Sequence, residues 1–270
     1  MEYGVYFNMC RFLVYWGKKE INASKWILTK ENCLLDQSVN DCSERPNPDG
    51  WGFAYRHNNK IYLIKNTKPA FDDESYKPTA KKIVADLLFA HVRRRSQGSI
   101  SIENTHPFRY NNWIFMHNGN IPGFDTFKVE LSRKLTVNNF GMKGTTDSEF
   151  LFRYFISLFQ KGKKSDVYCA LNFIYTIIHD VTSLISTENN DMFALNFMLT
   201  NGNFILGFRR NRSLYYAIIE EGVLISSEKI DNQYQWNEVP ENHFIIAPKP
   251  NEIKLAAFDI QLEEIRLSNI

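Results

Sequence analysis

The chain has 270 residues, of which 32 are basic and 30 acidic, giving a formal net charge of +2. An apolar fraction of 44%, with 14% aromatic residues, supports an extensive core and excludes a disordered chain. The balanced charge provides no bulk attraction for nucleic acid or a membrane surface, and no apolar run approaches the ~20 residues of a membrane span. We therefore expect one folded domain with no nucleic-acid or membrane partner.

The first half of the chain alternates short apolar runs with turns. In chain order, the patterns predict a strand over 10–16, a helix over 24–35, hairpin strands over 51–55 and 61–65, a helix over 77–86, and strands over 87–92 and 113–116. Asn58-Asn59, between the hairpin strands, is typical of a tight turn. The polar stretch 94–110 predicts a loop, and the last strand is expected to end at His117-Asn118-Gly119.

The second half opens with helices and closes with strands. The patterns predict helices over 124–135, 147–160 and 165–178, followed by strands over 193–199, 204–208, 214–219, 223–226 and 244–246. Thr146 or Asp147 is expected to cap the second of these helices, with Glu149 in its first turn. Two groups of strands around two central helices predict a layered α+β fold, although composition alone does not define the layers.

Cysteine and histidine usage argues against a metal site. The four cysteines are Cys10, Cys33, Cys42 and Cys169, and they show no short metal-finger spacing. With Cys10, the histidines at 91, 106 and 117 raise the alternatives of a zinc site or a Cys–His dyad, but their spacings match no helical metal-binding motif. We expect no metal and no cofactor, and free thiols that suit a reducing, cytoplasmic location.

Cys10 directly follows Met9, and a side chain as small as cysteine permits removal of an initiator methionine. A mature chain beginning at Cys10 would carry its own base, because the free α-amine, with a reference pKa of about 8, can take the thiol proton. Residues 1–8 lack the basic flank and apolar core of a secretory signal. We predict that they are an extension or propeptide absent from the active form. The alternative is a buried cysteine at the start of a strand.

Several motifs follow Met9-Cys10-Arg11 in order. They are Asn47-Pro48-Asp49-Gly50-Trp51-Gly52-Phe53, Ala90-His91-Val92-Arg93, Asn104-Thr105-His106-Pro107-Phe108, Phe115-Met116-His117-Asn118-Gly119-Asn120, Thr145-Thr146-Asp147-Ser148-Glu149 and Ser226-Ser227-Glu228. Together they resemble the class II glutamine amidotransferases, which begin with Cys and use His-x-Arg, His-Asn-Gly-Asn and Thr-Asp-Ser-Glu segments. The resemblance runs from Met9 to about Pro248, and it looks most like the small stand-alone branch that includes γ-glutamyl amidohydrolases.

The resemblance implies a four-layer α-β-β-α sandwich of the N-terminal-nucleophile hydrolase type. It implies that residues 9–270 form a single glutamine amidotransferase type 2 domain, in which Cys10 is the nucleophile that forms a thioester. The chain is expected to end with this domain. Ammonia or an amine would then be released, or passed to a separate acceptor protein.

The resemblance also assigns roles to residues outside the nucleophile. Asn118 and Gly119 would form the oxyanion hole through a side-chain amide and a backbone N–H. Arg93 and Asp147 would clamp the α-carboxylate and α-ammonium of a glutamyl group. Simpler alternatives stand beside these roles: an Asn-Gly hairpin turn, a surface charge within Arg93-Arg94-Arg95, and an ordinary helix cap.

Two further assignments concern the wall of the pocket. Trp51 and Gly52 would line it and bring backbone close to the nucleophile, although the glycines of this segment also suit a tight strand entry. His106 would line the substrate pocket or order the loop around it.

The expected function is hydrolysis of the γ-glutamyl amide of glutamine or of another γ-glutamyl compound. The motifs do not select the leaving group. One alternative is a non-catalytic glutamyl-binding or regulatory module, in which the N-terminal extension blocks Cys10. Another is a Cys–His protease, for which the cysteine can stay inside the chain.

Overall fold

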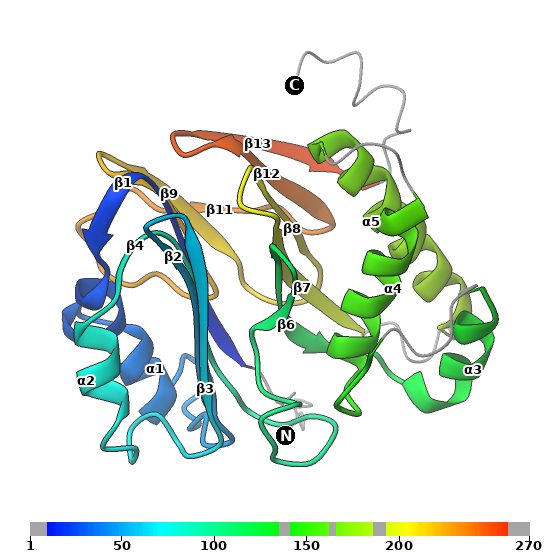
Figure 1. The fold of residues 1–270 in the computed structure, drawn as a ribbon, viewed down its shortest axis with the longest axis horizontal. Coiled ribbons are helices and arrows are strands. Elements are labelled where there is room, and N and C mark those ends of the chain that lie inside the picture. The colour runs from blue at the N-terminus through cyan, green and yellow to red at the C-terminus, as the bar shows by residue number, and fades with distance from the viewer. Residues whose placement is uncertain (1–9, 135–140, 162–165, 186–192, 259–270) are drawn as a thin grey trace, which may run out of the picture.

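The computed structural model of the chain describes residues 10–134, 141–161, 166–185 and 193–258. Within these ranges the protein contains two antiparallel β-sheets, called sheet A and sheet B below, with helices on the outer side of each (Figure 1). The predicted extension 1–8 lies outside the described residues.

Sheet A brings the start and the second half of the chain together. In spatial order its strands are β11 (Asn237–Glu238), β9 (Tyr215–Ile219), β10 (Gly222–Ser226), β1 (Arg11–Asn22), β4 (Val84–Val92), β2 (Trp51–His57) and β3 (Lys60–Asn66). The central strand β1 pairs with β10 on one side and β4 on the other. Leu13 therefore lies opposite Ser226, so a segment from the second half of the sequence lies beside the start of β1.

Sheet B carries the His-Asn-Gly-Asn motif. In spatial order its strands are β13 (Glu252–Ala257), β12 (His243–Lys249), β8 (Ile205–Arg209), β7 (Ala194–Thr200), β6 (Trp113–Asn120) and β5 (Phe108–Tyr110). Asn118 pairs with Asn196 and Gly119 with Leu195, so β6 continues through the motif. The strand ends at Asn120, one residue beyond the expected end at Gly119, and the alternative of a hairpin turn at Asn118-Gly119 is wrong.

The helices complete the layers. A short π-helix, η1 (Lys25–Thr29), and the helices α1 (Leu34–Val39) and α2 (Tyr76–Lys81) lie on sheet A, whereas α4 (Asp147–Lys161) and α5 (Val167–Leu184) lie on sheet B, with α3 (Phe124–Lys134) beside them (Figure 1). The order helix, sheet, sheet, helix confirms the four-layer sandwich predicted from the resemblance.

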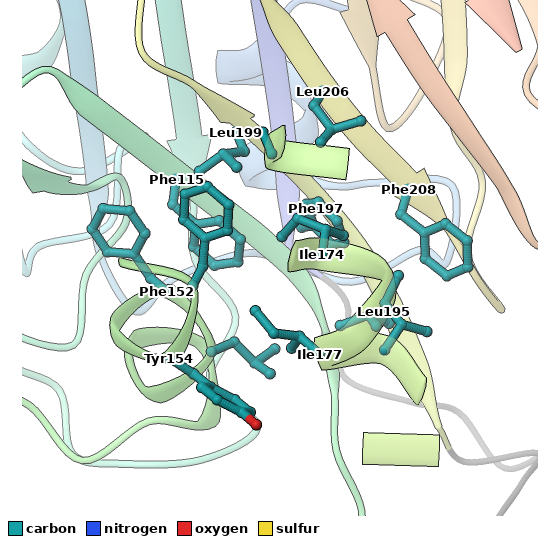
Figure 2. Close-up of a cluster of buried hydrophobic side chains, with 14 of the residues drawn as sticks. Phe115, Phe152, Tyr154, Ile174, Ile177, Leu195, Phe197, Leu199, Leu206 and Phe208 are labelled. Carbon is teal, nitrogen blue, oxygen red and sulfur yellow. The ribbon is translucent and has the colours of Figure 1, made fainter. Parts of the chain in front are cut away.

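Among the described residues, three apolar cores hold the four layers together. Trp26, Leu34 and Tyr76 belong to the core between sheet A and its helices. The two sheets meet through a second core that includes Phe12 and Met116. The third fills the space between sheet B and α4–α5, with Phe115, Phe152, Ile174 and Phe197 among its members (Figure 2). Burial of each such large side chain stabilises the fold by about 1.5–3 kcal/mol.

Tertiary contacts split one predicted helix and added three strands. The helix expected over 24–35 is split into η1 and α1, because Lys30 is extended and the backbone N–H of Asn32 donates to Ile230 O at 2.8 Å. The strands β11 and β13 had not been predicted, and β5 lies within the stretch 94–110 that was predicted to be a loop. The hairpin turn at Asn58-Asn59 is confirmed, with positive φ angles of 49° and 58° at the two residues.

Helix α5 corrects one expectation. It has the length and apolar content of a membrane span, alone among the described helices, so the statement that no apolar run approaches that length was too strong. One third (33%) of the residues in that window are buried inside the protein. Leu171, Ile174 and Ile178 are among them and pack in the core on sheet B. Core helices commonly meet the same criteria, so α5 is weak evidence for a membrane.

Candidate active site

Cys10 lies at the edge of the space between the two sheets. Directly paired residues of antiparallel strands share a face, and Phe12 pairs with His91, which pairs with Gly52. Phe12 belongs to the core between the sheets, so this face of sheet A looks toward sheet B. The same alternation places Cys10, two residues before Phe12, on that face.

The Cys10 thiol is held by the backbone N–H and the backbone carbonyl of one residue, Arg94. Its Sγ donates to the carbonyl oxygen of Arg94 at 3.1 Å, and the backbone N–H of Arg94 donates to Sγ at 3.3 Å. Burial raises the pKa of the thiol, while the Arg94 backbone hydrogen bond and the charges of Arg93 and Arg11 oppose that rise. The net direction is upward, so the thiol needs a nearby base to become a nucleophile at neutral pH.

Asn118 projects into the same space from the opposite sheet. It shares the face of β6 that carries Met116, a member of the core between the sheets. Its side chain is 1% exposed, and neither its Oδ1 nor its Nδ2 has a hydrogen-bond partner among the described residues. Buried polar groups in native proteins are almost always paired, so this amide has hydrogen-bonding capacity that the described residues leave unused.

Gly119 has a steric reason to be glycine. A Cβ atom at this position would lie 2.1 Å from Ala194 O, on the neighbouring strand β7, and 2.3 Å from His117 Nε2. Both distances are far too short for a carbon atom. The absence of a side chain therefore serves the pairing of β6 with β7, and it is compatible with the predicted role of the Gly119 N–H in an oxyanion hole.

Arg93 is a buried residue of the site, with 3% exposure, which rules out the alternative of a surface charge. Its Nη1 and Nη2 donate to the carbonyl oxygens of Ser99 and Gln97 at 3.1 and 2.9 Å. Burial lowers the pKa of Arg93, and the charges of Cys10, Asp49 and Asp147 act against that shift.

Asp147 begins α4 and is 2% exposed. Its Oδ2 accepts from the backbone N–H of Ile121 at 3.0 Å, and its Oδ1 accepts from the Ser148 N–H at 2.7 Å. Gln97 donates in turn to Asn120 Oδ1 and Ile121 O. The segment that holds Arg93 is thereby tied to the end of β6 and to Asp147, so the two halves of the predicted clamp are joined. The cap of α4 is Thr146, whose hydroxyl accepts from the Glu149 N–H at 3.2 Å, so Asp147 is the first residue of the helix and not its cap.

His117 faces away from Cys10. Its Nδ1 lies 2.9 Å from Ser148 Oγ, and its Nε2 lies 3.3 Å from Ala194 O, so it links β6 to α4 on the outer side of sheet B. Phe115, two residues earlier on the same face, belongs to the core under the helices. His117 is therefore not placed as the base of a Cys–His dyad.

His91 and His106 form a stacked pair beside the nucleophile strand. Their ring centroids are 4.4 Å apart, and His106 also meets Phe108 edge-on at 4.6 Å. Burial lowers the pKa of His91 to about 3 and that of His106 well below its usual value. Both rings are therefore neutral at physiological pH, and neither contacts the Cys10 thiol by a hydrogen bond recorded among the described residues.

Gly52 allows the loop of His106 to approach sheet A. A Cβ atom there would lie 2.2 Å from His106 O and 3.1 Å from Pro107 Cδ. Gly52 thus acts through close backbone contact on the inner face. Trp51 points the other way: its indole N–H donates to Asp73 Oδ2 at 2.9 Å, and its ring packs edge-on against Tyr76 in the outer core. This core position corrects the expectation that the Trp51 side chain lines the pocket.

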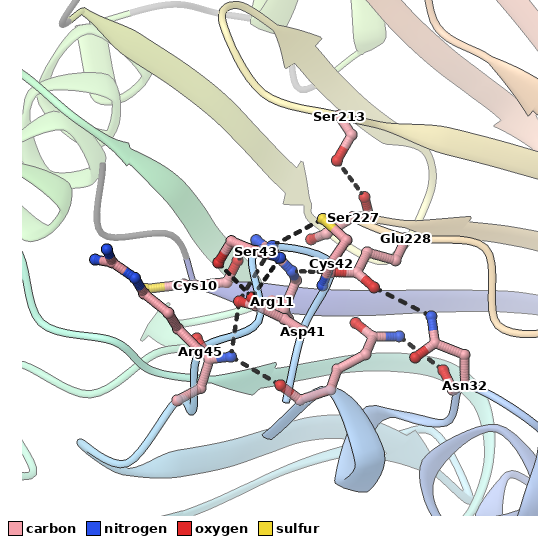
Figure 3. A network of polar contacts seen from close by, with 12 residues as sticks. Cys10, Arg11, Asn32, Asp41, Cys42, Ser43, Arg45, Ser213, Ser227 and Glu228 are labelled. Carbon is pink, nitrogen blue, oxygen red and sulfur yellow. Dashed lines mark hydrogen bonds and ion pairs between the residues drawn. The ribbon is translucent and has the colours of Figure 1, made fainter. Parts of the chain in front are cut away.

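A buried ionic network next to Cys10 was not predicted (Figure 3). Arg11 pairs with Glu228 and, at 3.1 Å, with Asp41, which also pairs with Arg94 at 3.0 Å. All four residues are nearly or fully buried. Arg94 is therefore a structural residue, not one of a run of solvated charges. The available signal in the sequence was Arg11, the one charged residue in the otherwise apolar run 10–16.

The remaining motif residues fix loops around the site. Asn104 donates to Ser99 O at 3.0 Å and accepts from the Thr145 N–H at 2.8 Å. Glu149 accepts from the backbone N–H groups of Lys143 and Gly144. Across the described part of the chain, no group of three or more His, Cys, Asp or Glu residues is arranged to hold a metal ion.

The sequence motifs and this geometry agree with one family of known proteins. The model of the class II glutamine amidotransferases matches residues 35–222 of the chain. The chain belongs to this family. The matched range includes Arg93, Asn118 and Asp147, whereas Cys10 precedes it and Glu228 follows it.

Individual curated proteins are also similar in sequence to this chain. A probable glutamine amidotransferase of Saccharomyces cerevisiae is 34% identical over 166 residues, which make up 57% of this chain and 46% of that protein. The gamma-glutamyl-hercynylcysteine sulfoxide hydrolase of Mycobacterium tuberculosis is 22% identical over 241 residues, or 88% of this chain and 92% of the hydrolase. The chain spans only 46–64% of the length of four of its curated relatives.

Solved structures confirm the fold. A glutamine aminotransferase class-II domain protein from Silicibacter pomeroyi superposes with a TM-score of 0.65 at 20% identity, covering 92% of this chain and 98% of its own. The glutamine phosphoribosylpyrophosphate amidotransferase of B. subtilis gives a TM-score of 0.64 at 15% identity, covering 93% of this chain and 50% of its own. The sandwich is therefore that of the N-terminal-nucleophile hydrolases.

Proposed function

We propose that this protein hydrolyses the γ-glutamyl amide of glutamine or of another γ-glutamyl compound through a thioester at Cys10. The observation that carries the proposal is the Asn118 amide, which is buried and unpartnered among the described residues on the sheet opposite Cys10. Leaving such a group unpaired costs about 1–3 kcal/mol. An oxyanion that develops on the substrate would supply the missing partner in the transition state.

The proposed reaction has two displacements at one carbon. The Cys10 sulfur attacks the γ-carbonyl carbon, the carbon–nitrogen bond breaks, and the thiol proton passes to the departing nitrogen, which leaves as ammonia or an amine. Water then attacks the thioester carbonyl, and the carbon–sulfur bond breaks. Glutamate leaves and the thiol is restored.

The base in both displacements would be the α-amine of Cys10. Burial raises the pKa of the thiol, so few molecules carry a thiolate at neutral pH without help. The two hydrogen-bond partners of Sγ are backbone atoms of Arg94, and neither can act as a base. An amide nitrogen could not serve either, so we propose that the active protein begins at Cys10.

Arg93 and Asp147 would hold the glutamyl end of the substrate. Two carbonyl oxygens orient the Arg93 guanidinium, and a planar guanidinium has further N–H groups with which to bind an α-carboxylate. The Asp147 carboxylate is oriented by backbone N–H groups at the start of α4 and can accept from an α-ammonium. A zwitterion bound at both ends would present its γ-amide at a fixed distance from this clamp.

The leaving group and its destination remain outside this clamp. The M. tuberculosis relative is named as a hydrolase of a γ-glutamyl compound, which supports a γ-glutamyl substrate here. We propose that ammonia or an amine is released, or passed to a separate acceptor protein. The four cysteines are free thiols, which supports a reducing, cytoplasmic location.

The start of the active chain provides the test. Two forms of the protein, one beginning at Met1 and one at Met9, would be compared by intact mass and by glutamate release from glutamine and γ-glutamyl peptides. We expect activity only from protein whose mass shows Cys10 at the N-terminus. Cys10→Ala in the same form should abolish turnover while glutamate still binds, because Arg93 and Asp147 are unchanged.

Two outcomes would count against the proposal. Full activity from protein that retains Met1 would exclude the α-amine as the base. Inactivity of folded protein with Cys10 exposed, combined with glutamate binding, would favour the alternative of a non-catalytic glutamyl-binding module.

A further inference from the structure

The residue after the proposed nucleophile is a fully buried arginine. Arg11 is 1% exposed, and it lies on the face of β1 opposite to Phe12. Its Nε donates to Glu228, its Nη2 lies 3.1 Å from Asp41 Oδ2, and its Nη1 donates to the carbonyl oxygen of Cys10 at 2.9 Å. One guanidinium therefore connects two carboxylates to the backbone of Cys10.

Two further residues, Cys42 and Asn32, hold Glu228 in place. Its Oε1 also accepts from the backbone N–H of Cys42 at 3.0 Å, and its Oε2 accepts from Asn32 Nδ2 at 3.1 Å (Figure 3). Just before it, the hydroxyl of Ser227 accepts from the Phe12 N–H at 2.9 Å. The segment 227–228 therefore fixes both residues that follow Cys10.

The network reaches the nucleophile from two sides. Arg11 holds the Cys10 carbonyl oxygen, whereas the backbone of Arg94 holds Sγ. The Arg94 side chain joins the same network through Asp41 and the Pro46 carbonyl, at 3.0 and 2.7 Å. Burial raises the pKa of Asp41, but the Ser43 hydroxyl and the charge of Arg11 outweigh burial and keep the carboxyl ionised.

A buried ion-pair network contributes little net free energy to the stability of a fold. Desolvation offsets most of the attraction between the charges, and apolar side chains of the same size often stabilise a core as well or better. The network does, however, fix the orientation of the Cys10 backbone. A hydrogen bond to the Cys10 carbonyl fixes the rotation of the peptide group that follows the cysteine. That rotation sets where its thiol and its α-amine point.

We propose that Glu228 is a positioning residue: by holding Arg11, it fixes the backbone of Cys10 so that thiol and α-amine face the substrate. This inference rests on the proposed function, in which Cys10 is the nucleophile. Loss of Glu228 leaves Arg11 with one carboxylate fewer and frees it to turn away from the Cys10 carbonyl. Displacement of a reacting group by about 1 Å can lower a rate by about a hundredfold.

The test compares three variants of the form that begins at Cys10. Glu228→Ala removes both the charge and the acceptors, and Glu228→Gln keeps one oxygen that can accept from Arg11. Asp231→Asn is the matched control. Asp231 is 5% exposed and pairs with Lys30 at 2.9 Å, and its other oxygen accepts from Gln233 and Tyr234. The Asp231→Asn variant thus loses an ion pair of the same segment, between a buried carboxylate and a partly exposed lysine, that does not involve Arg11 or Cys10.

Two measurements would be made on each folded variant. One is the rate at which iodoacetamide alkylates Cys10, followed on the peptide that carries Cys10 because Cys42 is exposed and also reacts. The other is kcat and KM for glutamine hydrolysis. We expect Glu228→Ala to lower the alkylation rate and kcat by about tenfold or more, with KM changed less than about twofold. Glu228→Gln should recover part of the loss, and Asp231→Asn should match the unmodified protein in both measurements.

Equal alkylation rates for Glu228→Ala and Asp231→Asn would overturn the inference. Alkylation does not depend on the proposed reaction, so the two ideas fail separately. If no form hydrolyses glutamine and Glu228→Ala still slows alkylation, the positioning role stands and the proposed function falls. If Glu228→Ala does not fold, a Glu228→Gln protein that alkylates at the unmodified rate would contradict the role.

Discussion

The amide of Asn118 is buried between the two sheets, and neither of its polar atoms has a partner among the described residues. In the absence of substrate, the free-energy cost of burying this unpaired amide therefore lowers the stability of the folded chain. We predict that Asn118→Ala lowers kcat for glutamine hydrolysis by roughly 10²–10³-fold with a smaller change in KM. The same variant should unfold at an unchanged or higher temperature, because it removes an unpaired polar group. Steady-state kinetics and calorimetry on one preparation check both parts, and a near-normal kcat would remove Asn118 from the oxyanion hole.

The neighbouring residues Arg93 and Arg94 should respond differently to the same change. Arg93→Ala removes a charge-assisted contact with the substrate, worth roughly 1.5–3 kcal/mol, or about 10- to 200-fold in kcat/KM, mostly through KM. Arg94→Ala instead breaks a buried ion pair with Asp41 and should lower the free energy of unfolding by about 3–5 kcal/mol. Urea unfolding and kinetics separate the two effects. A variant of Arg94 with wild-type stability would contradict the buried network.

At the residue scale, the sequence was informative where motifs keep a fixed order. The resemblance led to Cys10, Arg93, Asn118 and Asp147. Cys10 and Asn118 lie on the facing sides of the two sheets, and Arg93 is linked to Asp147 through Gln97 and Ile121. Arg11 and Glu228 were not assigned roles, because their partnership spans 217 positions and no local pattern records it. The prediction that the Trp51 side chain lines the pocket was wrong because adjacent residues of a strand face opposite sides of the sheet. The motif does not indicate which of the two sides faces the pocket.

At the scale of elements, strands were predictable from apolar runs, since strands covered on both faces are apolar throughout. Residues 12–16 of β1 are such a case, with Leu13 in the outer core and Phe12 in the core between the sheets. The hairpin β2–β3 was predictable because both turn residues are asparagine, which tolerates positive φ. In these cases local chemistry determines the element.

Elements that depend on distant partners were not predictable. The helix expected over 24–35 stops near Lys30, because Asn32 gives its backbone N–H to Ile230 and its side chain to Glu228. The strand β6 extends through Asn118-Gly119 because β7 pairs with it there, although the dipeptide by itself favours a turn. In both places a tertiary hydrogen bond overrides the local preference.

At the scale of the whole molecule, the layers follow from which faces are apolar, whereas the strand order does not. Strand β1 lies between β10 and β4, which are far apart in the sequence, and no hydrophobic pattern specifies that choice. The arrangement has a consequence for function. It brings the segment 226–228 beside the start of β1, where the proposed nucleophile is held.

The three buried histidines of the sandwich should make its stability depend on pH. Burial lowers the pKa of His91 to about 3, and it also lowers the pKa values of His106 and His117. In the unfolded chain a histidine has a pKa near 6.5. The unfolded state therefore takes up more protons than the folded state once the pH falls below about 6.5. The stability that neutral burial provides is fully present above that pH and is lost progressively toward pH 3.

We predict that the free energy of unfolding falls between pH 7 and pH 5, by roughly 2 kcal/mol from His91 alone. This window separates the histidines from the buried carboxyls such as Asp41, whose pKa lies below its usual value. Urea unfolding at several pH values measures the slope. His106→Phe keeps an aromatic ring against His91 and Phe108 but cannot be protonated, so it should flatten the slope, whereas His179→Gln, on the exposed face of α5, should not. A free energy of unfolding that stays constant from pH 7 to pH 5 would show that the imidazoles are not buried as neutral groups.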